Sequence, residues 1–553
     1  MQDSGDPFEV ALEVTRAGNL FTTHTPVEAG FDRFAPELIE KYLSFYAENR
    51  LKISMQQMLA LGRRDPNDRS EPFNMAYLAM HGSGGVNGVS RLHGEVSRRI
   101  FQPLFPRWPQ AEVPVGSVTN GVHTPTWDSA PADRLWTDTC GKGRWIGTLE
   151  CAAPGLRTVP DEQLWEMRSE ARAELVEYAR RRLARQLATQ GAPPAAVETA
   201  ARIFEPNTLT LGFARRFAEY KRPNLLLRDR ERLARVLCDR ERPVQIIVAG
   251  KAHPQDTVGQ GMIREWTEFV HREDVRPRAM FLSDYDSILA AHLVQGVDVW
   301  INTPRRPWEA SGTSGMKTLV NGGLNLSELD GWWAEAYTPQ VGWSLGDGLE
   351  HGNDPAWDAA EAEALYRLLE HNVVPEFYRR DAHGVPTGWV SRMRESMALL
   401  TPQFSANRAV REYTERYYLG AAAAFQRRSA GESALGKELV RWQAQLAQHW
   451  DAIRFGDLRV ERRDDQWLFE VQVYLDELGP DAVRVELYAD AGKSPAVRQA
   501  MERGEELVGS TRGYLYSARV PASRPASDFT PRLIPYHPEA FVPLEARYIL
   551  WQR

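Results

Sequence analysis

A run of small residues followed by a lysine could do chemistry: the stretch EASGTSGMK begins at Glu309 and ends at Lys317. Successive backbone N–H groups of small residues can form an anion-binding nest, and the helix expected from about Met316 adds the positive end of its dipole. Gly312 and Gly315 would let the backbone approach a phosphate closely. A lysine at the end of such a nest can neutralise the anion or form a Schiff base with a carbonyl cofactor. An ordinary turn into a helix explains the same spacing about equally well.

A second group of cations favours the phosphate-binding interpretation. Arg215, Arg216 and Lys221 lie at or just beyond the end of an expected strand. Three cations in such a place usually form a solvated surface. If they lie beside the small-residue loop of the same sheet, arginine can grip an anion with two hydrogen bonds and lysine can supply a point charge. The sequence therefore predicts a clamp for a second phosphate.

The elements that must position these residues follow an alternating pattern. Short β-branched runs separated by helical segments are typical of a doubly wound parallel sheet. In such sheets ligands bind at the carboxyl ends of the strands. Arg215, Tyr285 and the loop from Glu309 to Lys317 all follow strand ends. The expected strands are 208–216, 244–251, 278–283 and 297–302, with helices between them that include 222–237.

The chain divides into three predicted parts. Residues 1–120 are interpreted as a remnant of an N-terminal Rossmann-like domain whose earlier strands are absent, with a helical pattern over 36–61. Residues 121–428 are expected to form the Rossmann-like domain that carries the loop, together with its closing helices. Residues 429–553 are expected to form a helix followed by an antiparallel β module, with strands at 458–475, 483–489, 514–521 and 545–553.

Two surface features have competing interpretations. The basic run Arg180 to Arg182 lies in a helical pattern and is expected to be a solvated helix face. The aromatic residues of the β module could form a carbohydrate platform, but the sheet core is favoured about two to one because buried aromatic residues are common. These residues are Trp467, Tyr474, Tyr488 and Tyr516.

Composition limits the classes of function. The chain has 553 residues, 43% hydrophobic and 25% charged, which is ordinary for a globular protein. A net charge of −7 spread along the chain argues against general binding of nucleic acid or acidic membranes. The three cysteines have no metal-like spacing and are not expected to form a disulfide framework, so a reducing compartment is expected. No signal peptide and no membrane-spanning segment is recognised, so a cytoplasmic location is expected.

Several separate motifs together resemble one family. The motifs are FTTHTPVEAGFDRF, VNGVSRLHGEVSR, GFARRFAEYKRP, IIVAGKAHPQD and VDVWINTPRRPWEASGTSGMKTLVNGGLNLSELDGWW. In this order they are similar to the α-glucan (glycogen, starch or maltodextrin) phosphorylase family, and to its bacterial branch in particular. The resemblance runs from about Phe21 to Phe425, so the β module lies outside it.

The resemblance implies a glycosyltransferase-B fold, α/β in class, with two facing Rossmann-like domains and pyridoxal 5′-phosphate (PLP) in the cleft. Lys317 would hold PLP as a Schiff base, and Gly312 and Thr313 would cradle its phosphate. The cofactor-binding residues that the resemblance implies are Lys317, Thr313, Gly312, Arg215, Tyr285 and Trp127. Because the family is often dimeric, a homodimer is implied as well.

The resemblance also implies a reaction. The PLP phosphate exchanges a proton with inorganic phosphate, which protonates the glycosidic oxygen of an α-1,4-glucan and then captures the sugar as glucose 1-phosphate. Two phosphates pressed together need the neutralising cations nearby. The implied catalytic residues are His24, Arg216, Lys221 and Lys317, and the implied substrate-binding residues are Asn120, Tyr220, Glu309, Ser311 and Gly312.

Simpler interpretations of three of these residues remain open. His24, after a strand, could be an ordinary surface or core histidine. Asn120 could be a turn residue before Gly121. Glu309 could be an acid favoured by a helix dipole.

Two other functions are alternatives to the phosphorylase prediction. Nucleotide-sugar glucosyltransferases of the same fold often carry two glutamates eight positions apart, but here Glu309 is followed at that spacing by Lys317, which cannot accept hydrogen bonds from a ribose. A non-catalytic PLP- or glucan-binding relative, or a fragment, is the second alternative. In the family a long N-terminal portion with a glycine-rich loop precedes the His24 motif, so half of the catalytic cleft is expected to be missing from this chain.

Overall fold

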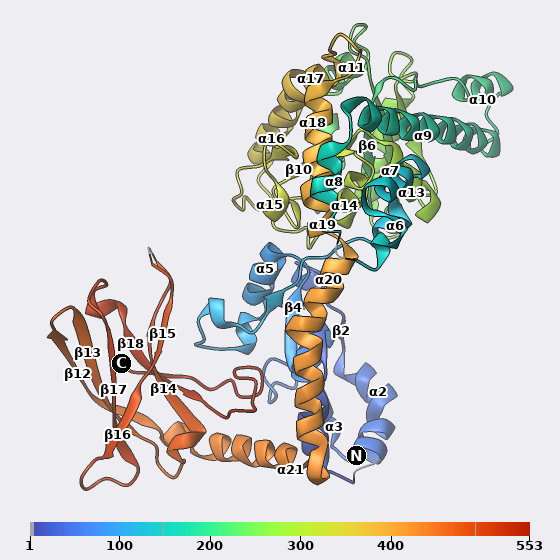
Figure 1. The fold of residues 1–553 in the computed structure, drawn as a ribbon. Coiled ribbons are helices and arrows are strands. Elements are labelled where there is room, and N and C mark those ends of the chain that lie inside the picture. The colour runs from blue at the N-terminus through green and yellow to red at the C-terminus, as the bar shows by residue number, and fades with distance from the viewer. Residues whose placement is uncertain (1–4, 148, 493) are drawn as a thin grey trace.

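The computed structural model describes residues 5–147, 149–492 and 494–553, and these form three parts (Figure 1). The largest part contains a six-stranded parallel sheet. A smaller N-terminal part contains a three-stranded parallel sheet, and the C-terminal part contains two four-stranded antiparallel sheets. The fold is therefore mixed α/β with parallel and antiparallel sheets, as the sequence predicted.

The six-stranded sheet has the order β11-β10-β9-β6-β7-β8. Its strands are β6 (Leu209–Ala214), β7 (Val244–Ala249), β8 (Ala279–Leu282), β9 (Val299–Asn302), β10 (Leu324–Glu328) and β11 (Gly342–Leu345). Strand order reverses between β6 and β9, because the chain passes from β6 outward to β8 and then returns to the other side of β6. The switch point is where open α/β sheets bind ligands.

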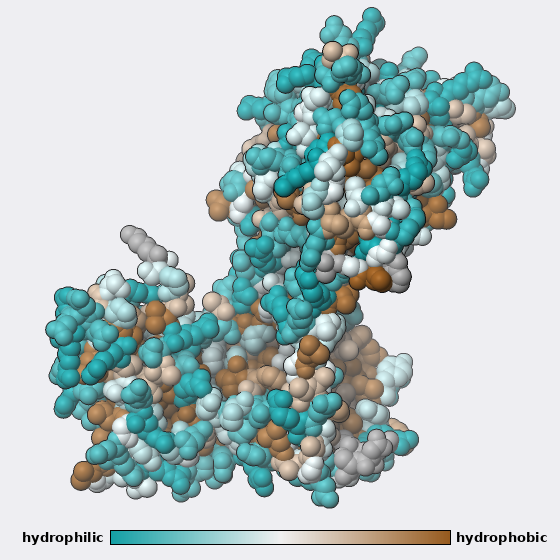
Figure 2. Space-filling view, in the orientation of Figure 1, coloured by the Kyte–Doolittle hydropathy of each residue, from teal (hydrophilic) through white to brown (hydrophobic). Residues whose placement is uncertain are grey.

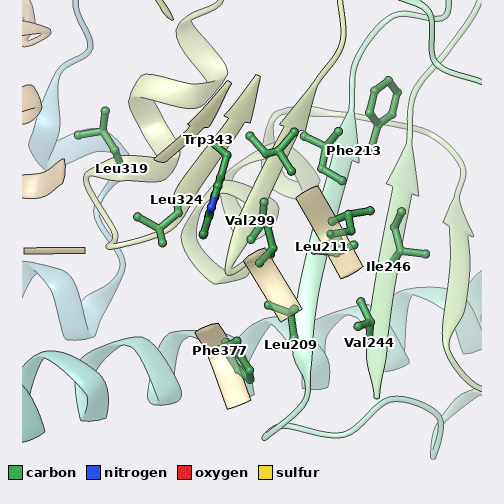
Figure 3. Close-up of a cluster of buried hydrophobic side chains, with 14 of the residues drawn as sticks. Leu209, Leu211, Phe213, Val244, Ile246, Val299, Leu319, Leu324, Trp343 and Phe377 are labelled. Atoms are coloured by element: carbon green, nitrogen blue, oxygen red, sulfur yellow. The ribbon is translucent and has the colours of Figure 1, made fainter. Parts of the chain in front are cut away.

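Helices cover both faces of this sheet, and each face packs into its own buried apolar cluster. Residues of β6, β7 and β9 pack with Leu319 of the loop helix and with Phe377 in the cluster of Figure 3. The strands are nearly uniformly buried, which explains why their sequences are continuous apolar runs rather than alternating ones. The helices of this part are α6 (Thr124–Trp127), α7 (Ala130–Cys140), α8 (Ala152–Thr158), α9 (Asp161–Thr189), α10 (Pro194–Ala200), α11 (Arg230–Leu237), α12 (Thr257–Val270), α13 (Ser287–Gly296), α14 (Thr313–Leu319), α15 (Trp333–Ala336), α16 (Pro355–Leu368), α17 (Val374–Tyr378), α18 (Thr387–Glu395) and α19 (Thr401–Gln403).

Two predicted helices are shorter than expected. The helix predicted over 222–237 begins only at Arg230, because Arg222 is left-handed (φ 44°) and the carboxylate of Asp229 accepts a hydrogen bond from the N–H of Arg232. The helical pattern over 36–61 is divided into α2 (Pro36–Tyr46) and α3 (Met55–Ala60), since Lys52 adopts φ 57°. Both breaks depend on a single left-handed residue that is not glycine, which periodicity does not reveal.

The N-terminal part surrounds the sheet β1-β4-β5. Its strands are β1 (Leu20–Thr22), β4 (Gly85–Gly88) and β5 (Gly116–Ser117), and a separate pair joins β2 (Arg33–Phe34) with β3 (Phe73–Asn74). Its remaining helices are α1 (Phe8–Arg16), α4 (Met75–His81) and α5 (Arg91–Phe101).

Helices α20 (Ala406–Tyr413) and α21 (Leu419–His449) leave the central part and run beside the N-terminal part (Figure 1). A kink at residues 430–433, where Gly431 has φ 56°, turns α21 toward the C-terminal sheets. The strands there are β12 (Arg454–Arg463), β13 (Gln466–Tyr474), β14 (Val483–Ala489), β15 (Val497–Ala500), β16 (Glu502–Glu506), β17 (Gly513–Pro521), β18 (Thr530–Pro535) and β19 (Leu550–Trp551). The predicted strand 545–553 is thus reduced to two residues.

The β-rich part packs on the N-terminal part. Arg532 of β18 binds the carboxylate of Glu112, and the indole N–H of Trp108 donates to the carbonyl of Arg547 at 2.8 Å. Figure 2 shows hydrophobic residues gathered where these two parts and α21 meet, on an otherwise largely hydrophilic face. Tyr488 and Tyr516 are each 4% exposed, so the sheet-core interpretation of these two aromatic residues is confirmed.

Three further observations bear on the sequence predictions. Cys140 and Cys151 form one disulfide between α7 and the residue before α8, a pairing that the sequence analysis did not predict. Arg180 and Arg182 are not a solvated face: the first donates to the carbonyls of Ile203 and Phe204, and the second to that of Asp284. Within the described ranges, no helix is both long and apolar enough to cross a membrane.

Candidate functional site

The small-residue loop lies between β9 and α14, at the switch point of the sheet. Gly312 precedes the first turn of α14 with φ 91°, a conformation that favours glycine. A Cβ at this position would lie 3.3 Å from the Cδ1 atom of Trp332 and 3.5 Å from the Cγ atom of Glu309. The glycine therefore allows the loop to fold back against Trp332, and in the first turn the N–H of Gly315 donates to the carbonyl of Gly312 at 3.3 Å.

Glu309 joins two of the predicted phosphate-binding cations. Its carboxylate contacts the guanidinium of Arg215, and its Oε2 atom lies 3.2 Å from the Nζ atom of Lys221. Burial alone would raise the pKa of Glu309, but the two cations outweigh it and lower the pKa. The site thus holds a carboxylate between two cations that favour its ionised form, an arrangement in which a phosphate oxygen could take the same place.

Lys317 has a different environment. Its Nζ atom lies 3.7 Å from the ring centroid of Trp127, and the side chain is half-buried. Within the described part of the chain, its ammonium group makes no hydrogen bond or ion pair. Burial lowers the pKa of Lys317. A partly desolvated lysine without a carboxylate partner is a better nucleophile than an exposed one, as attachment of a carbonyl cofactor requires.

Asn321 is a buried residue that links the backbone near Trp127 to the backbone of Lys317. Its amide donates to the carbonyls of Trp127 at 2.9 Å and of Lys317 at 3.0 Å, and its Oδ1 atom accepts from the N–H of Ser129 at 2.7 Å. Sequence reasoning missed it, because an Asn before Gly322 reads as a turn residue. Asn321 fixes α6 against α14 and so positions the Trp127 ring over the Lys317 amine.

Tyr285 follows β8 and, with Trp127, packs against the apolar cluster beneath the lysine. Burial raises the pKa of Tyr285, although the charge of Arg215 opposes this. The phenol therefore stays protonated and can donate a hydrogen bond.

Arg216 and Tyr220 lie in the loop after β6, which also carries Arg215 and Lys221. Arg216 is exposed, and its Nη2 atom is 3.5 Å from the Tyr220 hydroxyl. The ring of Tyr220 lies 4.8 Å from the Nζ atom of Lys221, and the backbone carbonyl of Tyr220 accepts from the N–H of Arg305 at 2.7 Å. Arg216 is therefore open to a ligand, whereas Lys221 is already engaged with Glu309.

His24 and Asn120 belong to the N-terminal part. His24 is exposed after β1, and Asn120 is held through its backbone, which bonds Val89 and Arg408. Across the described ranges, neither side chain contacts Lys317 or Glu309. The N-terminal part nevertheless touches the loop, because the hydroxyl of Ser90 donates to the carbonyl of Ala310 at 2.7 Å.

Several polar atoms in the loop region are buried without a partner among the described residues. Besides the Nε atoms of Arg305 and Arg306, they include the Oγ atom of Ser311 and the Nε atom of Arg215. Buried polar atoms in folded proteins are normally hydrogen-bonded, so Ser311 and Arg215 can each offer a hydrogen bond to a ligand. With Gly312 and the unpaired Lys317, these atoms fit the polar phosphate and the aldehyde of PLP.

A buried ion network behind the site was also missed. The guanidinium of Arg222 donates to the carbonyls of Thr303 and Pro304, and it contacts the carboxylates of Glu328 and Glu361. Burial and the neighbouring Glu361 raise the pKa of Glu328 to about 9. Arg222 directly follows Lys221 and so ties the cation loop to the strand end of β9.

Another perturbed carboxylate supports the loop from below. Asp330 accepts a hydrogen bond from the N–H of Glu309 at 2.8 Å, and burial raises its pKa to about 7. The backbone of Glu309 is therefore fixed independently of its side chain, which leaves the carboxylate free to change partners.

Comparison with known proteins gives a consistent result. A family model described as carbohydrate phosphorylase matches residues 1–341. The glycogen phosphorylase of Mycobacterium tuberculosis (strain H37Rv) is 39% identical over 552 residues, which cover 97% of this chain and 63% of that protein. The maltodextrin phosphorylase of Thermococcus litoralis is 37% identical over 549 residues, again 97% of this chain and 63% of that protein.

A third relative and the extent of the alignments add two facts. The glycogen phosphorylase of Aquifex aeolicus is 39% identical over 415 residues, which are 75% of this chain and 59% of that protein. The chain therefore spans somewhat less than two thirds of the length of these relatives. At 97% coverage, the first two alignments also include most of the β-rich part, which the sequence analysis placed outside the resemblance.

Proposed function

The chain belongs to the carbohydrate phosphorylase family, and from this premise we propose that it carries the cofactor-binding portion of a PLP-dependent α-1,4-glucan phosphorylase. Such an enzyme is a glycosyltransferase that moves the terminal glucosyl unit of glycogen or maltodextrin to inorganic phosphate and releases glucose 1-phosphate. The observation that carries this proposal is the half-buried, unpaired amine of Lys317 on a helix that starts at Gly312, in the same loop as Glu309.

In this proposal, the chain's own residues hold the cofactor. The Lys317 amine attaches it, the helix start at Gly312 and Thr313 binds its phosphate with help from Arg215, and Tyr285 and Trp127 line its ring. When bound, PLP supplies a phosphate group that can exchange a proton with inorganic phosphate. The lowered pKa of Lys317 and the orphaned Nε atom of Arg215 support these assignments.

The remaining residues would bind the reactants. Arg216 and Lys221 hold inorganic phosphate, so the Lys221 cation exchanges its carboxylate partner for a phosphate oxygen. This exchange releases Glu309, which with Ser311, Gly312, Tyr220 and Asn120 accepts or donates hydrogen bonds at the terminal glucose. His24 completes the sugar pocket from the N-terminal part. The contact of Ser90 with Ala310 supports this placement, because it brings that part to the loop.

We propose the wider architecture on the same basis. The β1-β4-β5 sheet and the six-stranded sheet would be the two facing Rossmann-like units of a glycosyltransferase-B fold, with boundaries near residues 120 and 428. We also propose a cytoplasmic location and a homodimer, the second of which follows from the family resemblance. The rival nucleotide-sugar reaction is disfavoured because Lys317 occupies the position of the second glutamate.

The test is phosphorolysis. The chain is incubated with PLP, maltoheptaose and inorganic phosphate, and glucose 1-phosphate is measured with a coupled assay. We expect release that depends on phosphate and is lost in Lys317→Ala. Cofactor binding without release of glucose 1-phosphate would favour the second candidate, a PLP-binding relative without activity.

A further inference from the structure

A cavity of about 380 Å³ lies at the edge of the six-stranded sheet, and none of the residues assigned to the cofactor or the sugar lines it. It opens between the end of α9, helix α10, helix α12 and the edge strand β8. Its floor is buried and apolar, and its walls combine half-buried apolar side chains with the polar side chains of Gln190, Thr199 and Thr267. The residues that form these surfaces include Val270, Met280, Phe281, Leu187, Ile203 and Ile263.

The polar backbone groups at the edge of β8 do not need a ligand in this cavity as a hydrogen-bond partner. Although β8 is an edge strand, Gln186 of α9 takes the place of a neighbouring strand. Its amide donates to the carbonyl of Phe281 at 3.2 Å and accepts from the N–H of Ser283 at 2.8 Å. These polar groups of the strand edge are already satisfied, so an apolar molecule could cover them without burying an unpaired donor or acceptor.

The rim of the cavity carries the positive charge of Arg276. Arg276 and His271 are exposed there, and no carboxylate side chain is among the described lining residues. Within the ranges that the structure describes, the Arg276 guanidinium has no ion-pair or side-chain hydrogen-bond partner. A molecule with a negatively charged head would therefore find an unpaired cation at the mouth.

We propose that this cavity binds a small molecule with an apolar body and a carboxylate head, of the kind represented by a medium-chain fatty acid. The volume lies within the range of pockets that enclose small ligands, and the lining has the usual composition of apolar walls with few polar groups. A glucan does not fit this chemistry, because the floor offers almost no hydrogen-bonding groups to its hydroxyls. The site is thus separate from the proposed reaction.

Isothermal titration of the full chain with decanoate, without PLP or glucan, tests the proposal. We expect one saturable site with a Kd of about 0.05 to 1 mM, as suits a small ligand of this size. Ala196→Trp fills the cavity from α10 and should abolish the binding. Ala188→Trp places the same ring on the exposed side of α9, outside the cavity, and should leave the Kd unchanged.

A second variant keeps the test decisive if the tryptophan at position 196 disturbs folding. Arg276→Ala changes only an exposed side chain and should weaken decanoate binding about two- to fivefold, the effect of losing one exposed ion pair. Arg235→Ala, an exposed arginine of α11, is the matched control. Absence of saturable heat up to about 5 mM decanoate, several times the weakest Kd expected here, would overturn the proposal. Unchanged affinity in a folded Ala196→Trp variant would contradict the proposed location of the site. Unchanged affinity in Arg276→Ala would contradict the proposed contact of a carboxylate head with this arginine.

Discussion

The amine of Lys317 faces the indole ring of Trp127 at 3.7 Å from the ring centroid, with no carboxylate partner among the described residues. A cation over an aromatic face is attracted to it, but the same ring removes water from the amine. The second effect is the larger here, because burial lowers the pKa of Lys317. The pair therefore holds the amine in place while making it easier to deprotonate, which suits covalent attachment of a cofactor aldehyde.

The first prediction concerns pH. Because only the neutral amine attacks an aldehyde, the rate of PLP attachment to Lys317 should rise with pH and level off below the value of 10.5 that is ordinary for lysine. Stopped-flow absorbance of PLP binding between pH 6 and 11 measures this profile. A lysine-containing peptide gives the unperturbed reference. Identical midpoints for the protein and the peptide would contradict the desolvated pocket.

The second prediction concerns Glu309. In Glu309→Gln the cations of Arg215 and Lys221 lose their buried counter-charge, so unfolding free energy should fall by about 1 to 3 kcal/mol. Inorganic phosphate should restore more stability to this variant than to the parent, since it can take the place of the carboxylate. Urea unfolding with and without phosphate measures both effects.

Glu350→Gln is the control for that comparison, because its partner Arg99 forms an exposed pair. It should change stability by less than about 1 kcal/mol and show no added response to phosphate. Equal phosphate responses in both variants would mean that Arg215 and Lys221 do not form a phosphate clamp.

The third prediction concerns Asn321. Asn321→Ala removes one buried and two partly buried hydrogen bonds and leaves the carbonyls of Trp127 and Lys317 without this donor, so it should cost about 2 to 4 kcal/mol of unfolding free energy. Because α6 would no longer be fixed against α14, PLP affinity should fall as well. Asn353→Ala, at an exposed position, should change neither quantity. Loss of stability without any loss of PLP affinity would restrict Asn321 to a structural role.

The fourth prediction concerns the network around Arg222. The folded-state pKa of Glu328 is raised to about 9 from an ordinary value of 4.5, so the folded state binds more protons than the unfolded chain between these limits. The stability that Glu328 contributes is therefore fully present below about pH 4.5 and is lost as pH rises toward 9. Glu328→Gln should reduce this decline of the unfolding free energy with pH. The stability of the variant relative to the parent should therefore be higher at pH 9 than at pH 5. Urea unfolding at both pH values checks it, and parallel curves for the parent and the variant would contradict it.

Local patterns predicted the parts of the molecule that depend on neighbouring residues. The strands β6, β7, β8 and β9 are short apolar runs between helices. Arg215 and Glu309 follow the carboxyl ends of β6 and β9, so they lie on the same side of the sheet. The loop from Glu309 to Lys317 could be recognised because small residues can bind a phosphate through their backbone and a lysine at that spacing can attach a carbonyl cofactor.

Contacts between distant segments could not be predicted in this way. Arg222 meets Glu361 across 139 positions, and Asn321 meets Ser129 across 192. Arg180 looked like a surface residue because its charge pattern resembles a solvated helix face, yet it donates to carbonyls 23 and 24 positions away. Nothing in the local pattern distinguishes an arginine that faces water from one that satisfies a loop carbonyl.

Lys317 is the residue that we propose to carry the cofactor. Incubation of the chain with PLP, followed by borohydride reduction and peptide mass mapping, tests this assignment, with Lys317→Ala and Lys251→Ala as paired variants. We expect one stoichiometric adduct on Lys317 that is lost in the first variant and retained in the second. Scattered labelling of exposed lysines, or an adduct that survives Lys317→Ala, would contradict it.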